Sequence, residues 1–174
     1  RYYLHVAYAT LYSASMFNVR LPSNEITLAD VLGAAGYATG MVGKWHLGDV
    51  SPSLPNDMGF DSFYGALYSN DLTPFELYRN TTVDIEAPVD QRKLSEIYTK
   101  EANAFIEQHE DEKFFLYLAH NFPHDPLSVR PERSGKSNAG LFGDVLEELD
   151  EGVGEIVATL ERTGNLDNTL IIIS

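Results

Sequence analysis

Apolar side chains recur at two different spacings along the chain, and each spacing predicts a different kind of element. In residues 28–35 and again in 94–108 they fall three or four apart, which is typical of one buried face of a helix. A third stripe of about five turns covers residues 141–160, and Gly164 behind it is a typical residue just beyond a helix C-terminus. The chain therefore has three predicted helices.

Polar residues mark where two of these helices begin. Thr27 stands before the first apolar position of the first helix, and Asp30 occupies the place that completes a capping box. Asp90 is suited to cap the second helix. Gly36 is expected to end the first.

Continuous apolar runs predict three buried strands, at residues 37–43, 114–119 and 170–174. Helices and strands alternate, so we expect an α/β fold with right-handed crossovers and a mostly parallel sheet covered on both faces. Residues 49–88 are rich in Pro, Gly, Asn, Asp and Ser and have no sustained period. They are predicted to form a long functional loop, and residues 1–20 a poorly defined segment.

Composition and charge narrow the possible functions. With 44% hydrophobic and 22% charged residues the chain is typical of globular domains. The net charge of −14 argues against a nucleic-acid or anionic-membrane surface, and no apolar run is long enough to predict a membrane span. The absence of cysteine excludes disulfides and a cysteine nucleophile within these 174 residues. Nothing in the sequence predicts the oligomeric state.

Lys44 and His46 directly follow the predicted strand 37–43. In an extended segment residues two apart point to the same side, so these side chains should project together while Trp45 points away. A compact positive charge beside an imidazole suits the binding of a tetrahedral anion. For an arbitrary Lys-x-His pair, a solvated lysine and an ordinary loop histidine remain the commoner explanation.

His120 and His124 follow the strand 114–119 in the same way. Their spacing would allow a metal site only on a helix, and Pro123 opposes a helix there. Two interpretations remain: a proton donor aimed from the end of a strand, or a histidine bonded to loop backbone. Since carboxyl ends of parallel strands meet at one edge, we expect both pairs, and the end of strand 170–174, to lie there together.

Three further polar groups have simpler explanations. An Asx-type turn accounts for Tyr-Ser-Asn-Asp at residues 68–71, and Asn80-Thr81-Thr82 matches the N-glycosylation pattern, which matters only for a chain exported by a eukaryote. The acidic residues of helix 141–160 are expected mainly on its solvated face: Glu147, Glu148, Asp150, Glu151 and Glu155.

Taken together, these segments resemble the type I sulfatases, particularly the arylsulfatase A-like and N-acetylgalactosamine-6-sulfatase-like members. Residues 36–48, GYATGMVGKWHLG, are similar to the second signature of that family. The similarity extends over roughly residues 21–174 and includes Leu21-Pro22, Thr27-Leu28-Ala29, Gly59-Phe60-Asp61, Tyr68-Ser69-Asn70-Asp71, Phe114 to Tyr117, Pro123 to Pro126 and Gly143-Asp144. The resemblance implies an alkaline-phosphatase-like three-layer sandwich, of which residues 1–174 are an incomplete, central part.

The resemblance also implies roles for four residues. Lys44 would contact the sulfate and the activated nucleophile, and His46 would hydrogen-bond that nucleophile and help to eliminate sulfate from it. His124 would stabilise or protonate the departing alcohol. Ser69 would be a further contact to the substrate.

Two parts of the family's site are missing from the sequence. The formylglycine nucleophile is made from the Cys or Ser of a Cys/Ser-x-Pro-x-Arg motif, and no such motif occurs here. The family's paired N-terminal aspartates for calcium are also absent. We expect calcium in the full-length parent, on ligands outside this chain, and none in residues 1–174, which alone should be inactive.

The resemblance implies a sulfated small molecule or carbohydrate as substrate, and a secreted, periplasmic or lysosomal location. Two alternatives stay open on the same scaffold. One is a phosphoesterase of the alkaline phosphatase superfamily, and the other is a non-catalytic domain that binds an anion or a protein partner.

Overall fold

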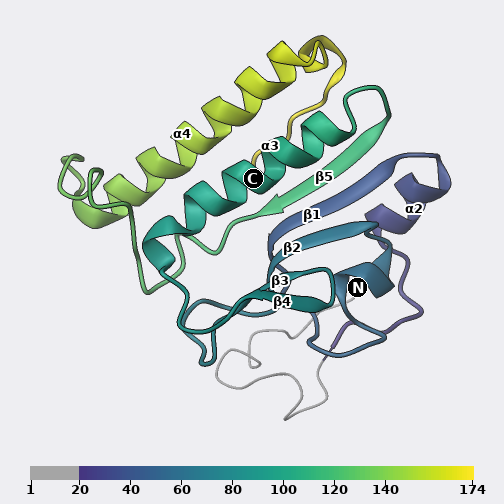
Figure 1. The fold of residues 1–174 in the computed structure, drawn as a ribbon, viewed down its shortest axis with the longest axis horizontal. Helices are drawn as coiled ribbons and strands as arrows, with labels where there is room; N and C mark the ends of the chain where they lie inside the picture. The colour runs from purple at the N-terminus through teal and green to yellow at the C-terminus, as the bar shows by residue number, and fades with distance from the viewer. Residues whose placement is uncertain (1–19) are drawn as a thin grey trace.

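The computed structural model describes residues 20–174, which form a mixed five-stranded sheet with helices on both faces (Figure 1). Except for Arg20, the predicted N-terminal segment 1–20 lies outside the described residues. The strands lie in the order β4-β3-β2-β1-β5, and their bounds are β1 Ala38–Lys44, β2 Ser62–Ala66, β3 Leu77–Arg79, β4 Thr82–Ile85 and β5 Phe114–Ala119.

The centre of the sheet is parallel, because β1 pairs in parallel with β2 on one side and β5 on the other. Two of the predicted strands, 37–43 and 114–119, are thereby confirmed. Backbones approach so closely here that a Cβ at Gly43 would lie 1.9 Å from the Ala119 carbonyl oxygen. Only glycine is tolerated at such a position.

The prediction of one long loop over residues 49–88 is wrong. This segment contains β2 and the antiparallel strands β3 and β4, with the exposed Asn80 in the turn between them at φ 54°. Each strand has only three to five residues, too few for a period to stand out among turn residues. The α/β class is confirmed, and the two antiparallel pairings make the sheet mixed.

The predicted terminal strand is also wrong in this structure. Residues 170–174 form no strand, and the side chains of Leu170, Ile172 and Ile173 are 85%, 79% and 76% exposed. An apolar run shows that a segment favours burial, but a strand forms only where a neighbouring strand completes its hydrogen bonds. In the described chain, β5 is the edge of the sheet and these residues do not pair with it.

All three predicted helices are confirmed, with bounds close to those expected. Thr27 and Asp30 form the capping box of α2, and Gly164 follows α4 in the left-handed conformation. Asp90 accepts a hydrogen bond from the Arg92 N–H and so caps a short 3₁₀ turn that leads into α3. The helices are α2 Leu28–Ala34, α3 Leu94–Gln108 and α4 Gly140–Arg162, with 3₁₀ turns η2 Pro55–Met58, η3 Gln91–Lys93 and η4 Leu166–Asn168.

Two hydrophobic clusters hold the layers together on opposite faces of the sheet. Adjacent residues of β1 divide between them, Val42 facing α3 and Met41 facing α2, as the alternation of a strand requires. Helix α4 packs on α3 (Figure 1). The first cluster comprises Val42, Tyr64, Ala66, Phe75, Leu77, Leu94, Tyr98, Phe122, Val129 and Val145, and the second Ala29, Met41, Trp45, Met58, Phe60, Phe63 and Leu67.

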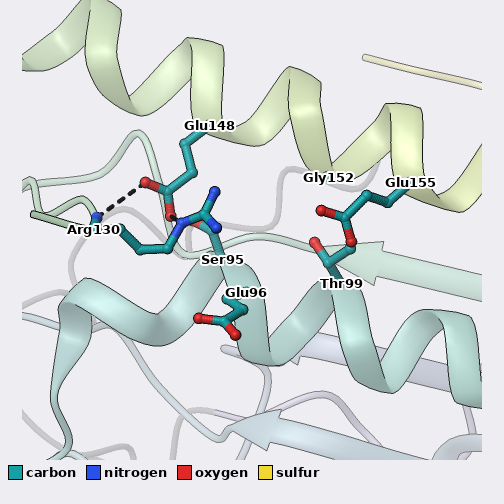
Figure 2. Close-up of a pocket in the computed structure, with 7 residues that line it drawn as sticks. All are labelled: Ser95, Glu96, Thr99, Arg130, Glu148, Gly152 and Glu155. Carbon is teal, nitrogen blue, oxygen red and sulfur yellow. Dashed lines mark hydrogen bonds and ion pairs between the residues drawn. The ribbon is translucent and has the colours of Figure 1, made fainter. Parts of the chain in front are cut away.

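A polar seam between α3 and α4 corrects one further prediction. Glu148, expected on the solvated face, is buried, and its Oε1 lies 3.3 Å from Arg130 Nε (Figure 2). Arg130 also pairs with Glu151 at 2.7 Å. Apolar periodicity misplaced Glu148 because the loop that carries Arg130 folds over this side of the helix. The remaining acidic residues of the set are exposed or partly exposed.

None of the helices in residues 20–174 combines the length and the apolar character needed to cross a membrane.

Candidate active site

Three loops that follow parallel strands meet at one edge of the sheet. Lys44 is the last residue of β1, Ser69 follows β2, and His124 follows β5. Parallel strands end at the same edge, so residues distant in sequence come together there. The predicted convergence of three strand ends is found, but β2 supplies the third end in place of residues 170–174.

Ser69 lies at the centre of this group. Its Oγ is 3.4 Å from Lys44 Nζ, which donates to it, and 3.4 Å from His124 Nδ1. The Ser69 side chain is nearly inaccessible, since the residue is only 4% exposed. Residues 68–71 are therefore more than a local turn, because they join the other two loops.

His46 adopts a backbone conformation that few residues tolerate. Its φ is 61°, so Lys44 and His46 are not related by an extended segment as predicted. Trp45 does point to the opposite side, where its ring is buried and its Nε1 donates to the Ser53 carbonyl at 2.8 Å. Strained backbone of this kind is found preferentially at functional sites.

The imidazole of His46 is half-buried and incompletely satisfied. Its ring meets the Tyr68 ring edge to face, with centroids 5.5 Å apart. Within the described chain its Nε2 is inaccessible and has no hydrogen-bond partner. A buried polar atom without a partner is costly, so this nitrogen is suited to bind a group that residues 20–174 do not supply.

Electrostatics at this edge disfavour positive charge on the site's own residues. Burial lowers the pKa of Lys44, although the Asp71 carboxylate opposes this effect. Burial likewise lowers the pKa of His46, and the nearby charges of Lys44 and His124 lower it further. An anion placed among these groups would offset both effects.

His124 has contacts that fit both interpretations left open above. Besides Ser69, its Nδ1 contacts the backbone carbonyl of Asp125, so it is indeed bonded to loop backbone. A carbonyl only accepts hydrogen bonds, which favours a proton on Nδ1 and leaves Nε2 to gain or release a second one. The ring is exposed and can reach a ligand.

His120 does not join this group. Its ring lies beside that of Tyr98, with centroids 6.3 Å apart, and burial lowers its pKa to about 4. The two histidines therefore have different environments, and the structure offers no support for a metal bound between them.

The described residues also do not form the calcium site that the resemblance implies. Across residues 20–174, no three His, Cys, Asp or Glu side chains are grouped so that they could hold a metal ion.

Sequence reasoning missed two residues that connect the loops of the site. Asn70 Nδ2 donates to Gln91 Oε1 at 3.0 Å and to the Pro126 carbonyl at 3.1 Å. Asn70 belonged to the segment singled out as 68–71, but no signal in the sequence relates it to Gln91 or Pro126, which lie 21 and 56 residues away.

Comparison with known proteins identifies relatives of the whole arrangement. The family model Sulfatase matches residues 2–174. Among curated proteins, human arylsulfatase A is 35% identical over 182 residues, and mouse N-acetylgalactosamine-6-sulfatase is 33% identical over 168 residues. Each match covers 87% of this chain, but 35% and 32% of the relatives, so the chain spans about a third of their length.

Solved structures share the fold. One, from work on the metabolism of multiple glycosaminoglycans by Bacteroides thetaiotaomicron, has a TM-score of 0.80 at 27% identity and covers 87% of this chain and 45% of its own. Another, Ps i-CgsB in complex with k-i-k-neocarrahexaose, has a TM-score of 0.75 at 27% identity, with coverages of 87% and 40%. The predicted alkaline-phosphatase-like α/β fold is thereby confirmed.

Proposed function

The chain belongs to the sulfatase family, and from this premise we propose that the protein hydrolyses sulfate esters, with Lys44, His46, Ser69 and His124 forming part of the site. One observation carries the proposal: the Lys44 ammonium and the His124 imidazole both contact Ser69, His46 lies near enough to feel their charges, and the Asp71 carboxylate acts on Lys44 and His46 only from a distance. Throughout residues 20–174, no carboxylate lies within ion-pair distance of Lys44, His46 or His124. A bound sulfate group would supply an anion in direct contact with them.

Lys44 and Ser69 bind the sulfate. The Lys44 ammonium neutralises the sulfate oxygens, and the Ser69 hydroxyl, 3.4 Å from Lys44 Nζ, holds both that ammonium and the His124 ring in place. Half-burial strengthens these interactions because less water screens them.

His124 acts on the leaving group. Negative charge builds on the ester oxygen as the S–O bond breaks, and a proton at His124 Nε2 stabilises that charge or is transferred to the oxygen. Residues 121–126 form a turn in which the His124 N–H donates to the Asn121 carbonyl at 3.1 Å, and this turn fixes the ring against Ser69.

His46 serves the nucleophile, which we propose to be a formylglycine supplied by residues other than those described. The hydrated form of formylglycine, a geminal diol, would supply a hydroxyl that accepts the sulfuryl group. The buried Nε2 of His46, which has no partner in the described chain, is suited to hydrogen-bond such a hydroxyl and to take up its proton. The calcium ligands are likewise proposed to lie elsewhere in the full-length protein.

The substrate is proposed to be an aryl or carbohydrate sulfate. Similarity to arylsulfatase A and N-acetylgalactosamine-6-sulfatase, over about a third of their length, supports this class without choosing within it.

The decisive experiment compares sulfate and phosphate esters of one alcohol. The full-length protein is assayed with 4-nitrophenyl sulfate and 4-nitrophenyl phosphate, and the polypeptide 1–174 alone is the inactive control. We expect kcat/KM for the sulfate to exceed that for the phosphate by about tenfold or more, since the single ammonium of Lys44 matches a singly charged ester better than a doubly charged one. Preference for phosphate would identify a phosphoesterase, and hydrolysis of neither would identify a binding domain. Activity in the polypeptide 1–174 would contradict an external nucleophile.

A further inference from the structure

A single buried amide joins two loops of the site. Asn70, which is 2% exposed, directly follows Ser69, and Pro126 comes two residues after His124. Asn70 Nδ2 donates to the Pro126 carbonyl at 3.1 Å and also to Gln91 Oε1 at 3.0 Å.

Gln91 links the Asn70 amide to the start of α3. It lies in η3, the turn that leads into α3, and its Nε2 donates to the Asn70 backbone carbonyl at 2.8 Å. Asn70 and Gln91 therefore bind each other reciprocally, which fixes the side-chain orientation of both. The Pro126 carbonyl can only accept, so the Asn70 side chain must present its NH₂ group there.

We call the hydrogen bonds that Asn70 makes with Gln91 and Pro126 the clamp. The clamp holds the loop of Ser69 against the loop of His124 and so affects the distance between these two residues. The Ser69 Oγ to His124 Nδ1 distance of 3.4 Å spans two loops that are far apart in sequence. The His124 loop has a second support, because the buried Tyr98 hydroxyl donates to Asn121 Oδ1 at 2.7 Å. That bond ties its first residues to α3, while Asn70 ties Pro126, near its end, to the loop of Ser69.

We propose that Asn70 is a positioning residue that sets the place of His124 relative to the sulfate bound at Lys44 and Ser69. This inference rests on the proposed function. Asn70 touches neither the substrate nor the reacting atoms, and it acts by holding Ser69 and Pro126 at fixed separation. Its loss displaces the group that serves the leaving alcohol and leaves the binding of sulfate oxygens largely intact.

The test replaces the donor without changing the shape of the side chain. In Asn70→Asp, the second carboxylate oxygen cannot donate to Gln91 Oε1 or the Pro126 carbonyl, and it repels both. The full-length wild type and variant are compared on phenyl sulfate, whose leaving group is poor, and on 4-nitrophenyl sulfate, whose leaving group needs little assistance.

We expect kcat/KM to fall about 10²-fold on phenyl sulfate and about tenfold or less on 4-nitrophenyl sulfate, because assistance by His124 matters most for the more basic alcohol. Ki for inorganic sulfate should change less than about threefold. If Asn70 only stabilised the fold, the substitution would reduce the fraction of folded protein. The rates on both esters would then fall by the same factor.

Asn103→Asp is the matched control. Within the described chain, the Oδ1 atoms of Asn70 and Asn103 are both inaccessible and without a hydrogen-bond partner. Asn103 lies on α3, however, and has no hydrogen bond to the loops of the site. Its substitution should leave the ratio of the two rates unchanged. An equal loss on both esters in Asn70→Asp, or the same change of ratio in Asn103→Asp, would overturn the inference while the proposed function stands.

The two proposals fail separately. A wild-type protein that hydrolyses neither ester contradicts the proposed function and, with it, any catalytic purpose for Asn70. Amide hydrogen exchange then tests whether Asn70 joins the two loops. Faster exchange in both residues 68–71 and residues 121–126 of Asn70→Asp would confirm that it does, and unchanged exchange would refute it.

Discussion

Two regions of this molecule concentrate ionisable side chains, and they treat charge in opposite ways. In the seam between α3 and α4, Arg130 lies 3.3 Å from Glu148 (Figure 2). Arg130 also lies 2.7 Å from Glu151, and Arg133 pairs with Glu151 as well. At the edge of the sheet, the Lys44 ammonium donates within residues 20–174 only to the Ser69 hydroxyl.

The difference separates a structural site from a binding site. Charges that leave water must find partners, and in the seam the ion pairs of Arg130 and Arg133 with Glu148 and Glu151 provide them within the chain, although Arg130 Nε and Glu148 Oε1 are paired by charge without a hydrogen bond. The cavity beside it, lined by Ser95, Thr99 and Gly152 among others, is about 10 Å³, room for a single water. At the edge, the half-buried Lys44 ammonium forms no ion pair within residues 20–174 and feels Asp71 only at longer range, so an anionic ligand can bind it directly.

The largest expected effect comes from removing charge at the edge. Lys44→Ala or His124→Ala in the full-length protein should lower kcat/KM for an aryl sulfate by about 10²-fold or more, because each removes a group that stabilises negative charge as the ester breaks. Steady-state kinetics on purified variants measures this. Arg133→Ala, which removes a cation from the seam, is the control and should change kcat/KM less than about twofold. If all three variants lost a similar share of kcat/KM, the edge of the sheet would have no special role in catalysis compared with the seam.

The reverse experiment breaks the seam. Glu148→Ala should lower the free energy of unfolding by about 2–3 kcal/mol, somewhat below the range for fully buried pairs because the Arg130 side chain is 24% exposed and keeps Glu151. Urea denaturation measures it. The exposed neighbour Glu147→Ala should cost less than about 0.5 kcal/mol. Equal costs for the two variants would show that Glu148 is no more than a surface charge.

The smallest expected effect is a change in the pKa of His46 when an anion binds at the edge of the sheet. The pKa of His46 lies below its ordinary value because burial, Lys44 and His124 disfavour the imidazolium, so the ring is neutral at pH 7. A bound anion favours the charged form, and saturating inorganic sulfate should therefore raise this pKa by about one unit. Imidazole proton shifts followed by NMR against pH report it. The ring proton signals of His109, the residue that ends α3, are the control and should not respond to sulfate. A constant His46 pKa would argue that sulfate binds elsewhere.

Periodicity located the long elements but not the short ones. In α3 and α4 the helical spacing of apolar residues repeats over four or more turns, and β1 and β5 are continuous apolar runs. Strands β2 to β4 are too short for a period, and residues 170–174 show that an apolar run without a neighbouring strand does not become one.

The candidate site divides in the same way. Lys44, His46 and His124 were identified because each follows a strand or lies near its end, and strand ends in parallel sheets converge. Ser69 was assigned only through the family resemblance. Asn70, Gln91 and the burial of Glu148 could not be found, because each depends on a partner from a distant loop.

By itself, the sequence determined the three helices, where they begin, the two central strands, and that lysine and histidine side chains stand at the ends of those strands. These properties depend on residues a few positions apart, whose geometry the backbone fixes locally. Tertiary structure alone decided that Ser69 lies between Lys44 and His124, that Asn70 joins two loops, and that ion pairs form in the seam but not at the edge of the sheet. Those outcomes depend on contacts across tens of residues, which form only when the sheet brings its strand ends together.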